Sequence, residues 1–184
     1  MKKVIPGPSD LWFLPLGGTG EIGMNMNLFG HDGEWLMVDC GVTFDEPLTD
    51  DSHRTHPVVS ADPKFIVQQR ERLQGIVITH AHEDHLGALP YLWTRLKAPV
   101  YATPFAAEVL RRKLSQHGLA SRVPIHIIPP GGRFRVGVFD LEFLPITHSI
   151  PEPQALLVTT PAGKVFHTAD WKIDHNPVIG EPFQ

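Results

Sequence analysis

Four side chains that can bind a metal ion lie within six residues near the middle of the chain. The segment reads His-Ala-His-Glu-Asp-His, and its ligand-type residues are His80, His82, Asp84 and His85. Imidazole nitrogens and carboxylate oxygens are natural ligands for zinc, and catalytic zinc sites keep one position open for water. Manganese can replace zinc at such ligands. The spacing therefore predicts a metal centre suited to hydrolysis.

The arrangement of these ligands favours two ions. His80 and His82 lie two residues apart in an extended loop, so their side chains project to the same side. Asp84 and His85 are offset from them and can face a second ion. The cluster forms either one crowded site or a paired site, and two ions about 3.5–4 Å apart are a well-known hydrolytic arrangement. Asp170 is the best candidate for a carboxylate between the ions.

Two further ligand-type side chains follow predicted strands in the last third of the chain. His148 comes shortly after the apolar segment 138–146, and Asp170 comes shortly after 164–167. Each strand delivers its side chain to the edge of a sheet. Position alone leaves a ligand role and an ordinary structural role equally open for both residues.

The remaining histidines have simpler interpretations. Those in turns or in mid-strand are interpreted as structural or solvated residues: His31, His117, His126 and His175. His53 and His56 lie in an acidic, proline-bearing loop, where solvation is favoured over adventitious metal binding. The role of this loop, 45–57, stays open. His167 precedes Asp170 and can orient a ligand through its second ring nitrogen.

Hydrophobic spacing predicts the elements that position the ligand-rich loop. The apolar segment 76–79 is typical of a buried strand. Leucine and tryptophan side chains recur at helical spacing from 86 to 96, which predicts an amphipathic helix over 85–97. A strand that stops in a ligand-rich loop and continues as a helix is the layout of a metal site at the edge of a sheet.

The other elements predict an α/β (α+β) fold with a mixed sheet. Two further helices begin at a capping residue followed by proline, and they cover 62–73, which Gly75 ends, and 103–118. The other predicted strands cover 11–16, 25–30, 34–39, 99–102, 123–128, 133–135, 138–146, 155–160 and 164–167. Strands and helices alternate in the middle of the chain, which is the pattern of crossover connections.

A glycine-rich segment, 17–23, contains the pattern G-x-G-x-x-G after a predicted strand. In a dinucleotide-binding site this pattern must open a helix. Here the residues that follow alternate between apolar and polar, and the turn residues 31–33 precede another strand. The context predicts a β-hairpin and disfavours nucleotide binding.

The composition is that of a soluble globular domain of 184 residues. The formal charge of −4 lacks the basic footprint of a self-sufficient nucleic-acid binder, which weakens that interpretation. The single cysteine, Cys40, cannot form an internal disulfide, so a reducing compartment is expected. Because no apolar leader and no membrane-length apolar segment is visible, we predict a cytoplasmic protein without membrane contact.

The segment 80–85 resembles the H-x-H-x-D-H signature of the metallo-β-lactamase superfamily. Together with three other segments, 17–25, 147–152 and 167–172, the sequence resembles ribonuclease J of the β-CASP branch, particularly its bacterial members. These segments occur in the order of that family and span nearly the whole chain. The resemblance implies a metallo-β-lactamase-like αββα sandwich.

The resemblance also implies two zinc sites that share one carboxylate. One zinc would be bound by His80, His82 and His148, the other by Asp84 and His85, with Asp170 bridging the two. Asp39 would be an acid that supports the site without binding metal. The residues expected to act directly in catalysis are Asp84, His85 and His148.

The function that the resemblance implies is hydrolysis of RNA phosphodiester bonds by a hydroxide held between the ions. Family members act as 5′-to-3′ exonucleases and, in some cases, as endonucleases. The expected partner is therefore an RNA substrate. Homo-oligomers are common in the family, but they form through regions that lie outside residues 1–184.

The chain departs from the family because it stops at Gln184. Residues 1–184 would be the N-terminal part of a metallo-β-lactamase domain, with the β-CASP and C-terminal domains absent. We therefore expect an incomplete sandwich, a second zinc site short of one ligand, and impaired activity. Two alternatives stay open: a stand-alone hydrolase of a small ester or thioester, and a non-catalytic binding module.

Overall fold

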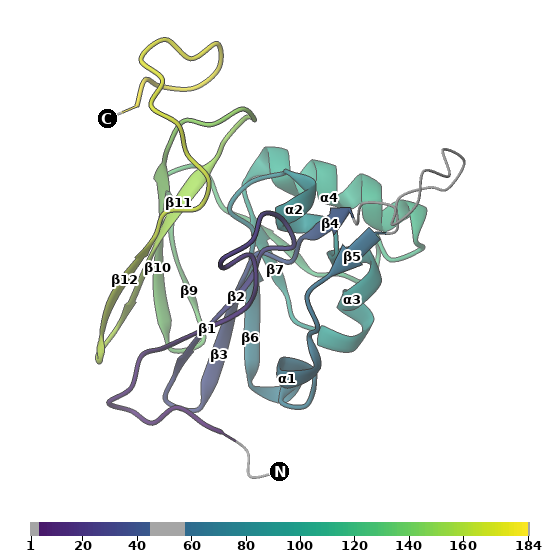
Figure 1. The fold of residues 1–184 in the computed structure, drawn as a ribbon, viewed down its shortest axis with the longest axis vertical. Helices are drawn as coiled ribbons and strands as arrows, with labels where there is room; N and C mark the ends of the chain where they lie inside the picture. Colours follow the sequence, from purple (N-terminus) through teal and green to yellow (C-terminus); the bar gives the residue numbers. More distant parts are fainter. Residues whose placement is uncertain (1–3, 45–57, 184) are drawn as a thin grey trace.

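The structure, a computed structural model, describes residues 4–44 and 58–183. The described residues form three layers (Figure 1). A six-stranded sheet lies in the middle, a four-stranded sheet packs on one of its faces, and the helices cover the other face. The acidic loop 45–57, whose role the sequence leaves open, lies outside the described residues together with His53 and His56.

The six-stranded sheet is mixed, as predicted. Its strands, in spatial order, are β1 (Trp12–Gly17), β2 (Met26–His31), β3 (Glu34–Val38), β6 (Leu73–Val77), β7 (Val100–Ala102) and β8 (Ile125–Ile127). The first three pair antiparallel, and β3, β6, β7 and β8 pair parallel. The hairpin predicted after the glycine-rich segment is confirmed by the pairing of β2 with β3, so this segment does not open a helix.

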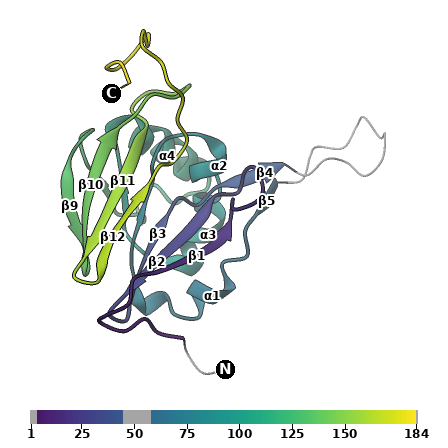
Figure 2. The ribbon, with the colours of Figure 1, turned by 60° about the vertical axis from the view of Figure 1, so that its left-hand side comes forward.

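The four-stranded sheet contains the last strands of the chain, and Figure 2 shows its strands side by side. It comprises β12 (Gly163–His167), β11 (Gln154–Thr160), β10 (Phe139–Pro145) and β9 (Arg133–Val136), in that spatial order, and all neighbours are antiparallel. The predicted hairpin at 161–163 is confirmed between β11 and β12. A separate two-stranded sheet pairs β4 (Val42–Phe44) with β5 (Val58–Ser60).

The helices lie together on one face of the six-stranded sheet (Figures 1 and 2). They are α1 (Lys64–Val67), α2 (Glu83–Leu86), α3 (Leu89–Leu96) and α4 (Pro104–Gln116). The prediction for 103–118 is confirmed by α4. Within the described ranges, no helix combines the length and the apolar character needed to cross a bilayer.

Alternation along the central strands divides the apolar side chains between two cores. On β3, Trp35 and Met37 face the helices, whereas Leu36 and Val38 face the four-stranded sheet. The second sheet meets them with Phe139, Phe143 and other alternate residues. Because both faces of the central sheet are covered, the apolar residues of β3 (35–38) and the end of β6 (76–77) are consecutive instead of alternating with polar residues. The described residues thus supply the α, β and β layers of the expected αββα sandwich.

The prediction of a helix over 62–73 is wrong in its length. Asp62 accepts a hydrogen bond from the backbone N–H of Lys64 at 2.9 Å, as expected of a residue that starts a helix. Helix α1 nevertheless ends after four residues, and a single 3₁₀ turn follows. Leu73 is already the first residue of β6, where it pairs with Trp35 and is buried in the core.

Gly75 was predicted to end that helix, but it lies inside β6. A Cβ atom at this position would come within 2.8 Å of the Tyr101 ring and 2.7 Å of the Val136 side chain. The glycine is therefore required by close packing between the strand and its neighbours and not by a helix terminus.

The prediction of one continuous helix over 85–97 is also wrong, because α2 and α3 are separate. The carbonyl of Asp84 accepts the N–H of Asn25 at 2.9 Å, and the carbonyl of His85 accepts the N–H of Cys40 at 2.7 Å. In a continuous helix both carbonyls would accept N–H groups from residues four positions further on. Long-range partners replace these two helical hydrogen bonds, and the helix breaks.

Candidate metal centre

The predicted ligands meet at one edge of the two packed sheets. The loop 80–85 follows β6, His148 follows β10 and Asp170 follows β12, so three strand ends contribute. The backbone N–H of Gln154, the first residue of β11, donates to the carbonyl of Thr79 at 3.0 Å. This hydrogen bond ties the second sheet directly to the start of the ligand-rich loop.

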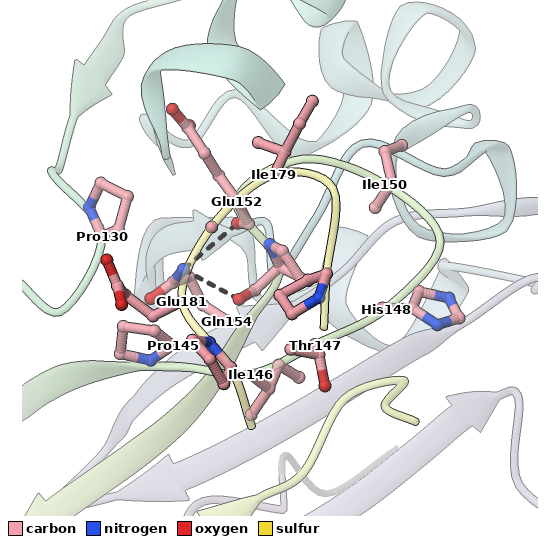
Figure 3. Close-up of a pocket in the computed structure, with 14 residues that line it drawn as sticks. Pro130, Pro145, Ile146, Thr147, His148, Ile150, Glu152, Gln154, Ile179 and Glu181 are labelled. Atoms are coloured by element: carbon pink, nitrogen blue, oxygen red, sulfur yellow. Dashed lines mark hydrogen bonds between the residues drawn. The ribbon is translucent and has the colours of Figure 1, made fainter. Parts of the chain in front are cut away.

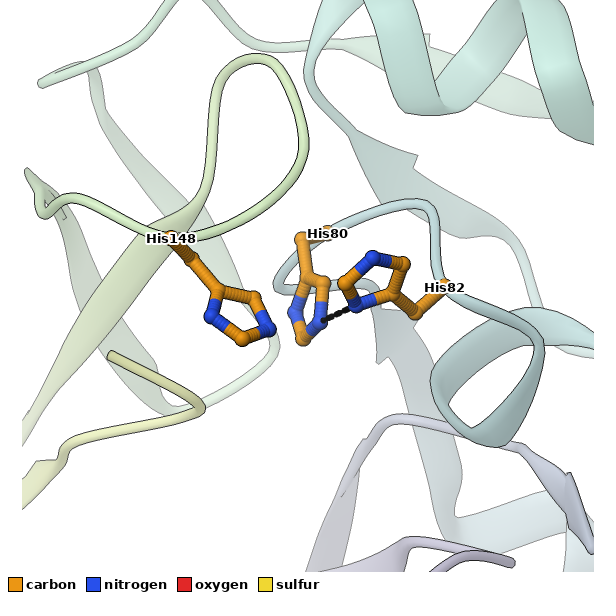
Figure 4. Close-up of side chains that lie close together, drawn as sticks. All are labelled: His80, His82 and His148. Atoms are coloured by element: carbon orange, nitrogen blue, oxygen red, sulfur yellow. Dashed lines mark hydrogen bonds between the residues drawn. The ribbon is translucent and has the colours of Figure 1, made fainter. Parts of the chain in front are cut away.

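Three histidines form one compact group, which we call the histidine side: His80, His82 and His148. One ring nitrogen from each lies within 4.8 Å of the others. Nε2 of His80 is 3.0 Å from Nδ1 of His82. Figure 4 shows the three rings turned toward one another, with His148 approaching from a different strand end. This is the set of residues expected to bind the first zinc.

The second group, which we call the carboxylate side, consists of His85, Asp84 and Asp170. Nε2 of His85 lies 3.5 Å from a carboxylate oxygen of Asp84 and 3.5 Å from one of Asp170. His80, His85 and Asp170 also offer ligand atoms within 4.8 Å of one another, whereas Asp84 lies just outside that cluster. Asp170 is 3.8 Å from Nε2 of His148, so its carboxylate borders both sides.

A fully buried carboxylate, Asp39, fixes the orientation of a histidine on each side. Its Oδ2 accepts a hydrogen bond from Nδ1 of His85 at 2.8 Å. The Thr79 hydroxyl lies 2.9 Å from Oδ2 of Asp39 and 3.0 Å from Nδ1 of His80. Because a carboxylate can only accept, the hydroxyl donates to Asp39 and accepts from His80. The Nε2 atoms of both histidines are then directed to the centre, which is how second-sphere carboxylates prepare metal ligands.

The protonation of the two sides differs. Burial, reinforced by the positive charge of His85, lowers the pKa of His80 to about 3, so this ring is neutral and able to bind metal. Burial and His82 likewise lower the pKa of His148. For His85, burial opposes the charged form, but the Asp39 carboxylate and hydrogen bonds to Asp170 and Asp39 raise its pKa to about 10.

The carboxylates are held in their charged form. A hydrogen bond from His85 lowers the pKa of Asp170 to about 2, against the effect of burial. Burial would raise the pKa of Asp39, but the charge and hydrogen bond of His85 lower it overall. In the metal-free molecule the carboxylate side therefore stabilises a positive charge on His85. Neutral imidazoles beside ionised carboxylates are a donor set that fits zinc.

Two loops that carry ligands are joined to each other. The Thr147 hydroxyl donates to the carbonyl of Lys172, and the N–H of Lys172 donates to the carbonyl of Thr147 at 2.8 Å. Thr147 precedes His148, and Lys172 lies two residues after Asp170. This reciprocal pair of hydrogen bonds fixes the spacing between the two ligands.

The histidines predicted to be structural lie outside both groups. His31 is buried with Nδ1 2.6 Å from the carbonyl of Asp10, and His126 stacks on Tyr101. His117 packs edge-on against Tyr91, and His175 is exposed. Nδ1 of His167 accepts a hydrogen bond from the N–H of Ala169 at 3.3 Å, so this ring supports the turn beside Asp170.

Sequence reasoning missed the roles of Thr79 and Thr147 and the contact of Asn25 with Asp84. Each acts through a hydrogen bond to a residue that is distant in the chain or to a backbone group, and spacing carries no signal for such contacts. Asn25 belongs to the family-like segment 17–25, which marks the loop without assigning a role to any side chain in it.

A cavity of about 430 Å³ opens beside the metal centre. Proline and isoleucine side chains dominate its lining, among them Pro130, Pro145, Ile146, Ile150 and Ile179. Figure 3 shows His148 at one end of this pocket. Of the six predicted ligands, only His148 borders it, so the cavity adjoins the centre and does not contain it.

Comparison with known proteins identifies the family and the fold. Residues 34–183 match the family model described as "Beta-lactamase superfamily domain". The solved metallo-beta-lactamase fold protein YhfI from Bacillus subtilis superposes with a TM-score of 0.62 at 20% identity, covering 86% of this chain and 61% of that one. At this identity the superposition shows the fold alone, and the fold expected from the sequence is confirmed.

Curated relatives confirm the more specific resemblance. A protein named Ribonuclease J from Sinorhizobium meliloti is 49% identical over 175 residues, which cover 93% of this chain and 30% of the relative. Ribonuclease J from Synechocystis is 40% identical, covering 94% of this chain and 27% of the relative. The chain thus spans less than a third of the length of these relatives.

Proposed function

The chain belongs to the beta-lactamase superfamily, and we propose that it supplies the metal-binding part of a ribonuclease that hydrolyses RNA phosphodiester bonds. The observation that carries the proposal is the convergence of six nitrogen and oxygen ligands, three on each side of the centre. RNA is proposed as the substrate because of the identity to proteins named Ribonuclease J. By the same resemblance, we propose 5′-to-3′ exonuclease activity in a cytoplasmic enzyme, with the endonuclease activity of some family members as a further proposal and with activity impaired in residues 1–184 alone.

We assign one zinc ion to the histidine side and a second to the carboxylate side, with Asp170 shared. Bound zinc polarises phosphoryl oxygens and lowers the pKa of bound water, and manganese would supply similar chemistry. Asp39 and Thr79 hold His85 and His80 with their Nε2 atoms toward the centre.

The ligand side chains that are partly exposed to solvent indicate where a substrate would approach the metal centre. The Asp84 side chain is 32% exposed and that of Asp170 46%, whereas that of His85 is 2% exposed. Asp84 can therefore orient an attacking water and accept its proton. His148, at 19% exposure, lies on the open side and is the histidine best placed to face a scissile phosphate.

The cavity beside His148 favours a second candidate, hydrolysis of a small ester or thioester. Its apolar lining would suit an acyl group better than a charged phosphate backbone. The net charge of −4 also adds little attraction for RNA. Turnover of such an ester without hydrolysis of 5′-monophosphorylated RNA would favour this alternative.

The proposal is tested by zinc content and RNA hydrolysis. The chain should retain zinc after dialysis, measured by elemental analysis, and the substitution His82→Ala should reduce it. His126→Ala is the matched control, because this histidine stacks on Tyr101 outside the centre and should not change zinc content. A wild-type chain that stays metal-free in excess zinc would contradict the proposal. Zinc-dependent cleavage of 5′-monophosphorylated RNA, absent in Asp170→Asn, would support the substrate.

A further inference from the structure

Asn25 lies against the carboxylate side of the metal centre, and its side chain is not among the predicted ligands. It occupies the loop between β1 and β2, far in sequence from the residues it touches. Its Nδ2 atom lies 3.1 Å from the backbone carbonyl of Asp84, 3.3 Å from Oδ2 of the same residue and 3.1 Å from Nε2 of His85. One amide group thus contacts two neighbouring ligands.

The chemistry of these neighbours determines which end of the Asn25 amide faces them. The carbonyl and the carboxylate of Asp84 are acceptors, so the amide must present its N–H groups to them. At Nε2 of His85 the amide makes no lasting hydrogen bond, because this nitrogen faces the Asp84 and Asp170 carboxylates and would direct its lone pair to a bound ion. The orienting hydrogen bonds of the amide are therefore those to Asp84.

The Asn25 backbone is fixed by two more hydrogen bonds. Its N–H donates to the Asp84 carbonyl at 2.9 Å, and its carbonyl accepts the N–H of Gly41 at 2.9 Å. Gly18 leaves room for the side chain, because a Cβ atom there would lie 2.3 Å from Oδ1 of Asn25. The glycine-rich segment therefore packs around this asparagine, and that accounts for at least one of its glycines.

We propose that Asn25 is a positioning residue for the carboxylate side: its amide N–H groups hold the backbone and the carboxylate of Asp84 in the orientation that faces the centre. The proposal rests on the proposed function in one respect, namely that an ion binds on this side. The histidine side lies beyond the reach of these hydrogen bonds and serves as an internal reference.

The test is zinc titration of the metal-free chain by calorimetry, with Asn25→Leu as the main variant. Leucine has a similar shape but donates no hydrogen bond. We expect two ions in the wild type, and loss of an outer hydrogen bond should weaken the ion on the carboxylate side on the order of 10- to 100-fold. The ion on the histidine side should be unchanged. Thr19→Ala, an exposed position in the same loop, is the control and should bind both ions normally.

A metal-free measurement separates local from global effects. In ¹⁵N spectra of the histidine rings, Asn25→Leu should shift the signals of His85 and leave those of His82 and His148 in place. If that variant does not fold, Asn25→Ser retains a donor, and its second-ion affinity should fall below that of the wild type.

Three results would overturn the inference. Unchanged affinity for the second ion in a folded Asn25→Leu chain would show that the amide is dispensable. A wild-type chain that binds a single ion would have no ion on the carboxylate side for Asn25 to affect. Equal weakening of both ions would indicate a general packing role. If the wild type binds no zinc at all, the proposed function itself fails, which is a distinct outcome.

Discussion

The histidine side and the carboxylate side of the centre are held in place by different means. On the histidine side the rings pack mainly against each other, with centroids 4.8–5.2 Å apart, and His148 comes from the second sheet. On the carboxylate side, His85 is buried and hydrogen-bonded to Asp39, and the loop backbone is anchored to distant segments. Both sides need the second sheet, which supplies His148 to the first and Asp170 to the second. The carboxylate side is fixed in addition by hydrogen bonds to Asp39, Asn25 and Cys40.

This difference has a consequence for metal binding. The neutral imidazoles of the histidine side can bind an ion without losing a proton. On the carboxylate side, protonated His85 is stabilised by the carboxylates of Asp39, Asp170 and Asp84. A metal ion that binds there must displace the proton of His85. We therefore expect the histidine side to bind the first equivalent of zinc.

The largest effect should come from removing Asp170, whose carboxylate borders both sides. It lies 3.5 Å from Nε2 of His85 and 3.8 Å from Nε2 of His148, whereas His82 belongs to the histidine side alone. Asp170→Ala should weaken both ions, and His82→Ala should weaken only the ion on the histidine side. Zinc titration by calorimetry measures the difference. Equal results in the two variants would mean that the sides do not share Asp170.

The next largest effect, on stability, should come from Asp39, which is hydrogen-bonded to His85 directly and to His80 through Thr79. Asp39→Ala leaves a buried histidine without its carboxylate partner, and breaking such a pair costs about 3–5 kcal/mol. Urea unfolding with a chelator present measures this loss of stability. Asp140→Ala is the control, because the Asp140 side chain is 63% exposed and its removal should change stability by less than about 0.5 kcal/mol.

The stability of the metal-free chain should depend on pH in opposite directions for His85 and His80. The folded pKa of His85, about 10, lies above its ordinary value of 6.5, so its contribution to stability is complete below pH 6.5 and disappears as the pH rises toward 10. The folded pKa of His80, about 3, lies below 6.5, so its contribution disappears as the pH falls toward 3. Urea midpoints across this range should pass through a maximum, and Asp39→Asn should flatten the alkaline limb. An alkaline limb that is unchanged in Asp39→Asn would assign it to other groups.

The smallest effect is expected from the glycine loop, where two positions form a matched pair. Gly18 and Gly20 both have positive φ, at 84° and 79°, so alanine strains the backbone equally at each. Only at Gly18 would the new Cβ atom reach Asn25, since nothing lies within 4 Å of a Cβ atom at Gly20. Gly18→Ala should therefore weaken the ion on the carboxylate side more than Gly20→Ala does. Similar zinc affinities in the two variants would contradict this reading of the loop.

Local patterns in the sequence predict α4 and most of the strands, because these depend on helix-start residues and on apolar runs or alternation. The short strands β4 and β5 were not predicted. The exceptions are positions where a distant segment decides. Leu73 fits a helical pattern, yet its pairing with Trp35 places it in a strand. Residues 85–97 have helical spacing, yet Asn25 and Cys40 take two of the carbonyls that a helix would use.

The ligand-rich loop could also be predicted from local patterns in the sequence. Its histidines are adjacent in sequence, and His148 and Asp170 lie at strand ends that alternation identifies. The supporting role of Asp39 was expected from the family resemblance alone. Its hydrogen bond to His85, and the contacts of Thr79 and Asn25, could not be predicted, because contacts between residues so distant in the chain leave no trace in spacing. Their roles require the packed sheets.

The break between α2 and α3 also bears on the order of assembly. A helix as short as α2 has no stability of its own in water, so the ligand-rich loop acquires its shape only when the segments around Asn25 and Cys40 dock on it. These contacts close loops of 59 and 45 residues, judged from the residue numbers, and such closures are slow relative to local structure. The chain should therefore acquire zinc late in folding, and an ion that binds only the finished centre would stabilise the native state by an amount that grows with the logarithm of the zinc concentration.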